Sequence, residues 1–177
     1  MTAYYVITTA LSIINFIALI MVVDSKKVDY YFTLLMLIMA ISNVGYLATG
    51  ISVSVEEAVL ATKISYIGGC FTSPIMIFMI GLICKYNIKR LFKVLIYSYC
   101  FIVYFMILSI GFSDIYYTSY HLGTLWDSTI VVSEYGPGHN MFYLILYGTI
   151  AIQLAMLIHS MIKKRSVSRK NLFLLFG

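Results

Sequence analysis

The chain has 177 residues, of which 62% are hydrophobic and 11% are charged, and its formal net charge is +5. Soluble domains are typically about 45–50% apolar and about 25% charged, so this composition excludes a water-soluble globule and a disordered chain. The mean hydropathy of +0.95 indicates an integral membrane protein.

Apolar segments long enough to cross a bilayer recur along the chain. Each has 19 to 22 residues without Lys, Arg, Asp or Glu, and they cover residues 4–23, 30–51, 64–84, 94–112 and 141–162. A spanning helix needs about 20 apolar residues, whereas strands of a membrane barrel alternate over about 10. A further segment, 171–177, rises only about 10 Å as a helix. We expect an all-α, polytopic transmembrane helix bundle with five full spans and the start of a sixth, in which 1–177 form one incomplete domain.

Basic residues predict the orientation of these spans. Eleven of the twelve follow the first, third or fifth segment, and only Lys63 lies elsewhere. Cytoplasmic connections of membrane proteins are enriched in Lys and Arg, so we expect these three connections in the cytoplasm and the amino terminus outside. The chain is then a multi-pass protein of the cell membrane whose partner is the lipid bilayer. The pI of about 9.0 reflects this topology, and no nucleic-acid partner is expected.

Polar residues inside the predicted spans are few. Asn15, Asn43 and Gln153 fall near the centres of their spans, where amides commonly hydrogen-bond between helices. We interpret them as intramembrane packing residues that meet at one depth, with a ligand site as the alternative. Pro74, which follows Gly68 in the third span, predicts a kink and close helix packing. The five segments hold no Asp, Glu, Lys or Arg, which disfavours a pump or an ion-coupled transporter.

Chemistry-bearing side chains form no known catalytic pattern. Cys70, Cys84 and Cys100 all lie within spans, and none forms a Cys-x-x-Cys pair. The three histidines lack metal-ligand spacing, and the chain has no glycine-rich phosphate loop and no serine nucleophile motif. We therefore expect no catalytic residue, no metal and no cofactor in the visible chain.

The connection 113–140 is the longest one between spans. Connections of this length are usually functional or structured. Thr, Ile and Val residues follow Asp127 and Ser128 in its middle, which predicts a small β-hairpin with a turn at these two residues. We expect the hairpin to lie over the outer mouth of the bundle.

The end of this connection runs directly into the fifth span as Tyr-Gly-Pro-Gly-His-Asn, residues 135–140. Asn140, or a residue just before it, is the expected helix cap, so that unpaired backbone donors point outward and favour an anionic or carbonyl group. An ordinary helix start is the equally weighted alternative. The predicted ligand-binding residues are Trp126, Tyr135, Gly136, Pro137, His139, Asn140, Tyr143 and Tyr147. Most other tyrosines, Tyr66 among them, are interpreted as interfacial anchors.

Tyr135-Gly136-Pro137 closes this outer loop before a fifth helix that contains Tyr143 and Tyr147. Together with an outside amino terminus, this pattern resembles the amino-terminal seven-transmembrane region of histidine kinases and diguanylate cyclases. The resemblance implies a receptor that precedes a cytoplasmic effector in the same protein, such as a PAS, histidine kinase or GGDEF domain. It implies two-component signalling if the effector is a kinase, and a homodimer is compatible with it.

The functional prediction is a bacterial membrane sensor. We expect the chain to pass an extracytoplasmic or membrane stimulus, such as an unknown small-molecule ligand, to a cytoplasmic effector beyond residue 177. The visible chain is then no enzyme, although the full-length protein is a histidine kinase or a diguanylate cyclase. The main alternative is a transporter or channel subunit. A retinal-based light receptor needs a lysine within a span, and a structural membrane protein without a ligand is the remaining alternative.

Overall fold

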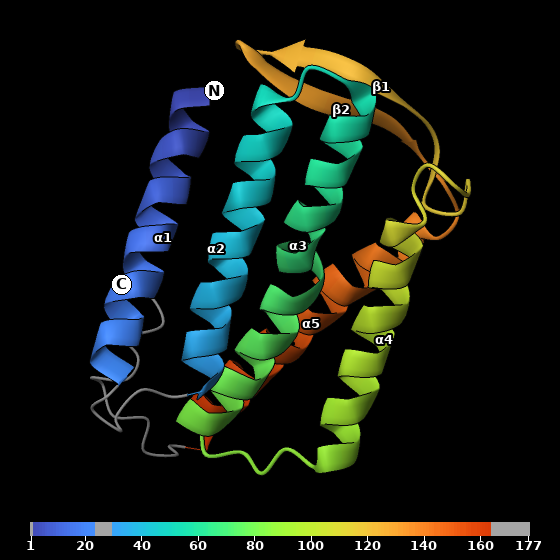
Figure 1. The fold of residues 1–177 in the computed structure, drawn as a ribbon. Helices are drawn as coiled ribbons and strands as arrows, with labels where there is room; N and C mark the ends of the chain where they lie inside the picture. The colour runs from blue at the N-terminus through green and yellow to red at the C-terminus, as the bar shows by residue number, and fades with distance from the viewer. Residues whose placement is uncertain (1, 24–29, 164–177) are drawn as a thin grey trace.

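The computed structural model describes residues 2–23 and 30–163, and within them the chain forms helices that run side by side and one β-hairpin (Figure 1). The hairpin lies across one end of the bundle, called the hairpin end below, near the amino terminus and the α2–α3 connection. The elements in chain order are α1 (Thr2–Val23), α2 (Tyr30–Ile51), α3 (Val55–Ile83), α4 (Arg90–Leu108), β1 (Tyr117–Leu125), β2 (Ser128–Tyr135) and α5 (His139–Ile162). The expected sixth segment, 171–177, lies outside the described residues.

Within the described residues, four helices have the length and apolar composition needed to cross a membrane, namely α2, α3, α4 and α5. The chain is therefore a multi-pass membrane protein, as expected. Helix α1 contributes a shorter apolar segment, Ala3–Ala18, so the prediction of five full spans is not confirmed.

Helices α3 and α4 begin well before the apolar segments that predicted them. Helix α3 begins at Val55 because the Ser54 hydroxyl accepts a hydrogen bond from the Glu57 backbone N–H at 3.2 Å, while the Glu57 carboxylate accepts one from the Val53 N–H at 3.1 Å. This reciprocal arrangement starts a helix in a polar segment. Helix α4 likewise begins at Arg90 and ends at Leu108, before the expected residue 112. Hydropathy marks only the apolar part of a helix, and the helix itself can begin or end in polar residues on either side.

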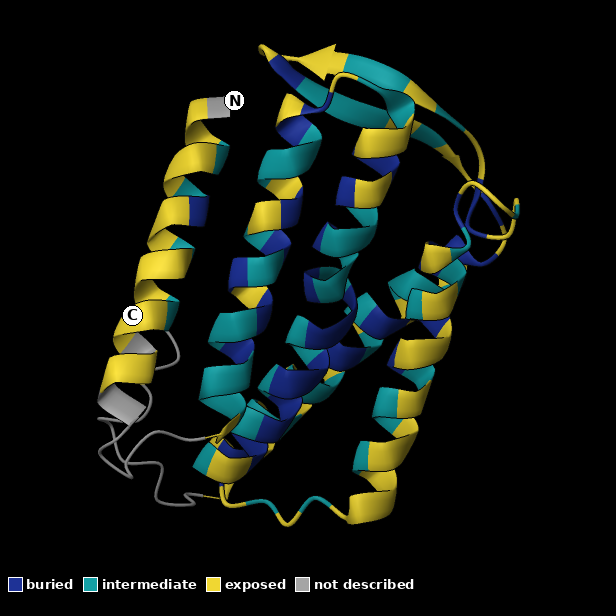
Figure 2. Cartoon of the chain, viewed as in Figure 1, coloured by how far each residue is buried: buried dark blue, intermediate teal, exposed yellow. Residues whose placement is uncertain are grey.

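Helix α3 is the centre of the bundle and contacts α2, α4, α5 and both strands. It carries many buried positions, whereas α1 is exposed over most of its surface (Figure 2). Glycines let α2 and α3 approach closely: a Cβ at Gly45 would overlap the Ser65 backbone, and one at Gly68 would overlap the Ser42 side chain. The Ser42 hydroxyl donates to the Ser65 carbonyl at 2.8 Å. The expected close approach at Gly68 is thus present, and Pro74 is buried within α3.

The intramembrane amides have different partners. The Asn43 side-chain amide donates to the Ser12 hydroxyl of α1 at 2.5 Å, and that of Gln153 donates to the Ser73 carbonyl of α3 at 2.9 Å. Asn15 lies on the exposed surface of α1. The expectation that the three amides meet is wrong for the described residues, because similar depth in the membrane does not set the direction in which a side chain points.

Candidate functional site

The hairpin is a regular antiparallel pair whose register runs from Tyr117 opposite Tyr135 at its base to Leu125 opposite Ser128 at its tip. Trp126 and Asp127 form the turn with φ values of +47° and +61°. Two consecutive residues with positive φ are typical of the two-residue turn that matches strand twist. The predicted hairpin is confirmed, but its turn lies one residue earlier than predicted because Ser128 already pairs within β2.

Contacts at the hairpin end attach the strands to the bundle. The Thr129 hydroxyl of β2 donates to the Ser52 carbonyl, just after α2, at 2.8 Å. Strand β2 contacts both α2 and α3, and β1 contacts α3. The hairpin therefore covers the end of the bundle, and its sheet rests on the start of α3.

Backbone hydrogen bonds join the base of the hairpin to the start of α5. The Gly136 N–H donates to the Tyr116 carbonyl at 2.9 Å, and the Gly138 N–H donates to the Ile115 carbonyl at 2.8 Å. A Cβ at Gly136 would overlap the carbonyl oxygens of Asp114 and Ile115. Only glycine therefore fits at this crossing, where the segment before α5 passes against the segment before β1.

The cap of α5 lies just before Asn140, as one of the two expected alternatives. Gly138 occupies the cap position, while Asn140 lies exposed inside the helix. The His139 N–H donates to the Gly136 carbonyl at 3.1 Å, and the Met141 N–H donates to the Gly138 carbonyl at 3.1 Å. These two backbone donors are therefore already paired within the chain, and the anion-docking site expected at this helix start stays a prediction.

Aromatic side chains from the hairpin base and α5 surround His139, and Tyr66 of α3 packs against two of them. The His139 ring stacks on Tyr135 with a centroid separation of 3.8 Å and an interplanar angle of 8°. Its centroid lies 4.7 Å from that of Tyr143 and 4.9 Å from that of Tyr116. We call this cluster the aromatic junction, and it comprises Tyr66, Tyr116, Tyr117, Tyr135, His139, Phe142 and Tyr143.

The junction buries polar atoms among its rings. His139 is 3% exposed, and its Nδ1 has no hydrogen-bond partner in the part of the chain that the structure describes. Burial raises the pKa of the Tyr116 hydroxyl well above its usual value, so this group stays neutral. The hydroxyls of Tyr66 and Tyr117 share a hydrogen bond of 3.0 Å. Unpaired buried polar atoms are rare in proteins, so His139 marks this position as a candidate site.

The predicted ligand-binding residues separate into two groups: one lies at or beside the junction, and the other is Trp126 alone at the hairpin tip. Tyr135, Gly136, His139 and Tyr143 meet at the junction, and Tyr147 stacks on Tyr143 with a centroid separation of 5.9 Å. Pro137 and Asn140 are exposed residues beside it.

Trp126 lies instead at the tip of the hairpin and is 78% exposed. The register separates this tip from Tyr135 by the length of β2, which corresponds to roughly 27 Å at about 3.4 Å per residue. Trp126, which was predicted to bind ligand together with Tyr135 and His139, therefore lies far from both of them. Residues close in sequence along a hairpin are separated by its full length when one lies at the turn and the other at the base.

Sequence reasoning missed Tyr66, Tyr116, Tyr117 and Phe142. Tyr66 was interpreted as an interfacial anchor, yet its ring packs edge-on against Tyr116 at 5.5 Å and Phe142 at 5.2 Å. A signal for Tyr117 was available, because a hairpin register counted back from the turn places it opposite Tyr135. The position of Tyr66 depends on how α3 faces the hairpin, which no local pattern encodes.

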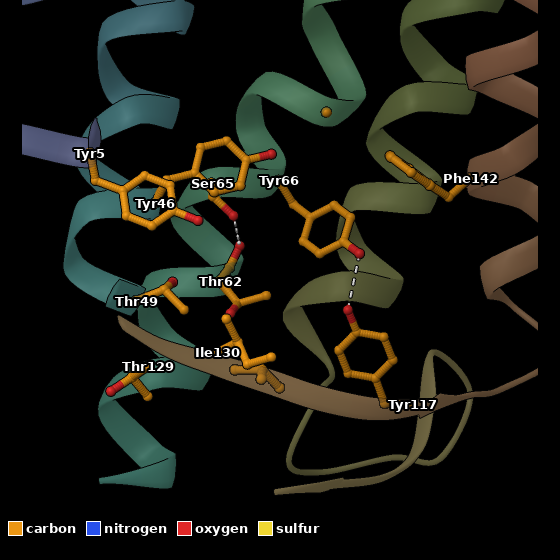
Figure 3. A pocket seen from close by; sticks show the side chains of 12 residues that line it. Tyr5, Tyr46, Thr49, Thr62, Ser65, Tyr66, Tyr117, Thr129, Ile130 and Phe142 are labelled. Carbon is orange, nitrogen blue, oxygen red and sulfur yellow. Dashed lines mark hydrogen bonds between the residues drawn. The ribbon is translucent and has the colours of Figure 1, made fainter. Parts of the chain in front are cut away.

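A cavity of about 330 Å³ lies beneath the hairpin, next to the junction (Figure 3). Its lining residues are Tyr5, Tyr46, Thr49, Thr62, Ser65, Tyr66, Gly69, Tyr117, Thr129, Ile130, Val131 and Phe142. Most of them carry a hydroxyl group, and none of these described residues is charged. The cavity and the junction share Tyr66, Tyr117 and Phe142, so a molecule in one would contact rings of the other.

This arrangement is suited to binding a neutral ligand. Within residues 2–23 and 30–163, no three His, Cys, Asp or Glu side chains are close enough to hold a metal ion together. The junction and cavity instead offer aromatic faces and hydroxyl groups, which are the features of a site for a neutral ligand.

Comparison with known proteins gives one match. The family described as the N-terminal 7TM region of histidine kinase matches residues 5–177. No curated protein and no solved structure matches the chain. The family match covers nearly the whole chain and confirms the resemblance that the sequence indicates.

Proposed function

We propose that this chain, which belongs to the family of N-terminal seven-transmembrane regions of histidine kinases, reads its stimulus at the aromatic junction. The family makes the chain a membrane sensing module of a signal-transduction protein, a region distinct from the catalytic part of a kinase. Family membership also favours sensing over the alternative of a transporter or channel subunit.

The observation that carries this proposal is the enclosure of His139. This residue belongs to the first turn of α5, while its stacking partner Tyr135 belongs to the hairpin base and Tyr66 reaches the same cluster from α3. A ligand or a membrane change that moves the hairpin therefore moves the start of α5. Packed rings favour discrete arrangements over gradual deformation, which is the property a two-state switch requires.

Access to the junction supports a ligand role for its outer edge. Tyr135 is 58% exposed and Tyr147 is 65% exposed, whereas His139 behind them is buried. A ligand that contacts Tyr135, Tyr143 or Tyr147 can shift the position of His139 without entering the core. Only differential affinity for two arrangements produces a signal, so the proposed stimulus binds one hairpin position more tightly than the other.

The proposed orientation has the hairpin end outside the cell. Glu56 and Glu57 lie in the first turn of α3 and Glu134 lies on β2, all at the hairpin end. Lys85 and Lys89 lie on the connection at the other end, which supports a cytoplasmic location for that end. Helix α5 runs from the hairpin end toward it, and we propose that it passes the shift to a cytoplasmic effector in the same protein, a histidine kinase or a diguanylate cyclase.

Effector output of the full-length protein tests the sensing role. We expect His139→Ala to abolish the difference between stimulated and basal output when membranes are exposed to cell extract. Tyr135→Phe keeps the stacked ring and should retain the response, and Trp126→Ala at the distant tip is the control that should respond normally. An unchanged response in His139→Ala, with normal membrane insertion, would contradict the proposal.

Orientation is tested separately by labelling a cysteine introduced as Glu134→Cys. The native Cys70, Cys84 and Cys100 are buried, so they give little background. A membrane-impermeant maleimide should label the variant in intact cells. Labelling that requires cell lysis would reverse the proposed orientation.

A further inference from the structure

We propose that the cavity beneath the hairpin binds a small uncharged molecule that carries a carbonyl oxygen on a flat apolar body and reaches the cavity from the membrane. This inference rests on the proposed sensing function, in which such a molecule is the stimulus. Binding can nevertheless be measured without any effector output, so the two proposals can fail independently.

Size and charge restrict the ligand class. The cavity volume of about 330 Å³ lies at the lower end of the range for small-molecule sites, about 300–1,000 Å³. The described lining residues carry no charge that could pair with an ionised ligand. Because an unpaired charge is costly to bury, an uncharged molecule is favoured over an anion or a cation.

The hydroxyl groups indicate a ligand that accepts hydrogen bonds. The hydroxyls of Thr49, Ser65 and Thr129 donate their protons to backbone carbonyls at 3.0, 2.8 and 2.8 Å. Tyr66 and Tyr117 share one hydrogen bond, in which only one of the two hydroxyls donates. The other hydroxyl of the pair still has its proton to donate, either to a ligand oxygen in the cavity or to the neighbouring buried hydroxyl of Tyr116. A carbonyl oxygen is the simplest uncharged partner for it.

Flat aromatic walls indicate the shape of the ligand. Tyr5 and Tyr46 stack on one side of the cavity with ring centroids 6.4 Å apart and an interplanar angle of 12°. Tyr66 and Phe142 line another side of the cavity with their rings edge-on to each other, at an interplanar angle of 83° (Figure 3). Gly69 leaves space beside them, because a Cβ there would lie 3.2 Å from the Phe142 ring. A planar ring can pack against such faces, whereas a branched body would meet them poorly.

A second cavity supports entry from the membrane. It has a volume of about 310 Å³, is lined by residues of α2, α3 and α5, and shares Tyr46 and Gly69 with the first cavity. These three helices are spans, so the second cavity lies at the level of the bilayer. A molecule that dissolves in lipid can reach the hydroxyl-lined cavity along this side without crossing the hairpin.

Three naphthalene probes of similar size test the ligand class. The full-length protein in lipid nanodiscs is titrated with 2-acetylnaphthalene, 2-ethylnaphthalene or 2-naphthoate, and empty nanodiscs give the bilayer background. We expect 2-acetylnaphthalene to bind and 2-ethylnaphthalene to bind about 3- to 10-fold more weakly, the equivalent of one hydrogen bond. The charged 2-naphthoate should bind weakest of the three.

Variants locate the binding within the cavity. Either Tyr66→Phe or Tyr117→Phe alone leaves one tyrosine hydroxyl free to donate, so binding of 2-acetylnaphthalene should be retained. The double variant removes both hydroxyls and should bind about 3- to 10-fold more weakly. Thr62→Phe fills the cavity and should prevent binding. Tyr104→Phe is the matched control, because its hydroxyl is bonded to the Lys63 carbonyl at 3.3 Å outside the cavity.

Three results would overturn the inference: equal binding of 2-ethylnaphthalene and 2-acetylnaphthalene, tighter binding of 2-naphthoate, or binding that neither Thr62→Phe nor the double tyrosine variant changes. Normal elution in size-exclusion chromatography confirms that each variant is folded. If binding fails while output still depends on His139, only this inference is wrong. If binding holds while His139→Ala responds normally, the proposed function fails instead.

Discussion

Helix α5 has a histidine beside a tyrosine at each end, and the two contacts are built differently. At the hairpin end, His139 is buried and stacked on Tyr135, and its Nδ1 has no partner in the described chain. At the other end, His159 is exposed and its Nδ1 is hydrogen-bonded to the hydroxyl oxygen of Tyr86. The Tyr86 hydroxyl is also within hydrogen-bond distance of the Met156 carbonyl, at 3.2 Å. One contact depends on ring packing, while the other depends on a hydrogen bond that solvent or headgroups can replace.

This difference shows where a signal can enter the helix. Removing an exposed hydrogen bond costs little, because water offers a substitute, whereas removing a ring from a packed cluster leaves a cavity. Perturbations at the hairpin end should therefore affect both stability and coupling. Those at the His159 end should affect neither strongly.

The largest effect is expected from His139→Ala. The free energy of unfolding should fall by about 2–5 kcal/mol, as for other buried large side chains truncated to alanine. Equilibrium unfolding by SDS in mixed micelles, followed by circular dichroism, measures this change. His159→Ala is the matched control on the same helix and should cost about 1 kcal/mol or less. Equal losses at the two ends would contradict the comparison.

Gly136→Ala should have the next largest effect. The added methyl group overlaps the carbonyl oxygens of Asp114 and Ile115, so the hairpin base must shift, at a cost of about 1–3 kcal/mol. Faster protease cleavage near the hairpin base should accompany this loss. Wild-type stability and wild-type cleavage would show that the crossing at Gly136 is looser than its geometry indicates.

Gly148→Ala tests the middle of α5, where the glycine is half-buried, and should act in the opposite direction. A Cβ there meets no described atom within 4 Å, so the variant should gain about 0.5–1 kcal/mol from helix propensity. The same SDS titration measures the gain. A loss of stability would mean instead that a segment outside the described residues packs on this face.

The smallest effect is expected from Tyr86→Phe. The variant removes the hydroxyl that bonds the exposed His159 but keeps the ring, whose centroid lies 5.7 Å from that of His159. Stability should change by less than about 0.5 kcal/mol, since solvent replaces the bond. Stimulated output should also remain normal. A loss of more than about 1 kcal/mol would place this contact in the same class as the junction.

Some features of the site could be predicted because they are local. The β-branched residues of 129–132 and the glycines and proline of 136–138 indicate a hairpin that ends before a helix, and the structure has both. Tyr135 and His139 were correctly expected near each other, since only one short turn separates them. Trp126 lies apart from them because a strand converts a few positions in sequence into a long distance in space.

Other features depend on contacts between distant segments. Tyr66 and Tyr117 are 51 positions apart in the chain, yet their hydroxyls share a hydrogen bond. Asn43 and Gln153 lie at similar depths but bond to different helices. A helix can rotate about its axis without changing its hydropathy, so sequence position alone does not predict these partners.

Residue order alone was sufficient to establish a membrane protein, most of its spans and its family, because the thickness of the bilayer imposes a length that apolar segments must match. The enclosure of His139, the pairing of Tyr66 with Tyr117 and the cavity between them became visible only in three dimensions. The physical reason is that lipid tails are as apolar as leucine: hydropathy sets the depth of a helix, while shape and hydrogen bonding set which face meets which neighbour.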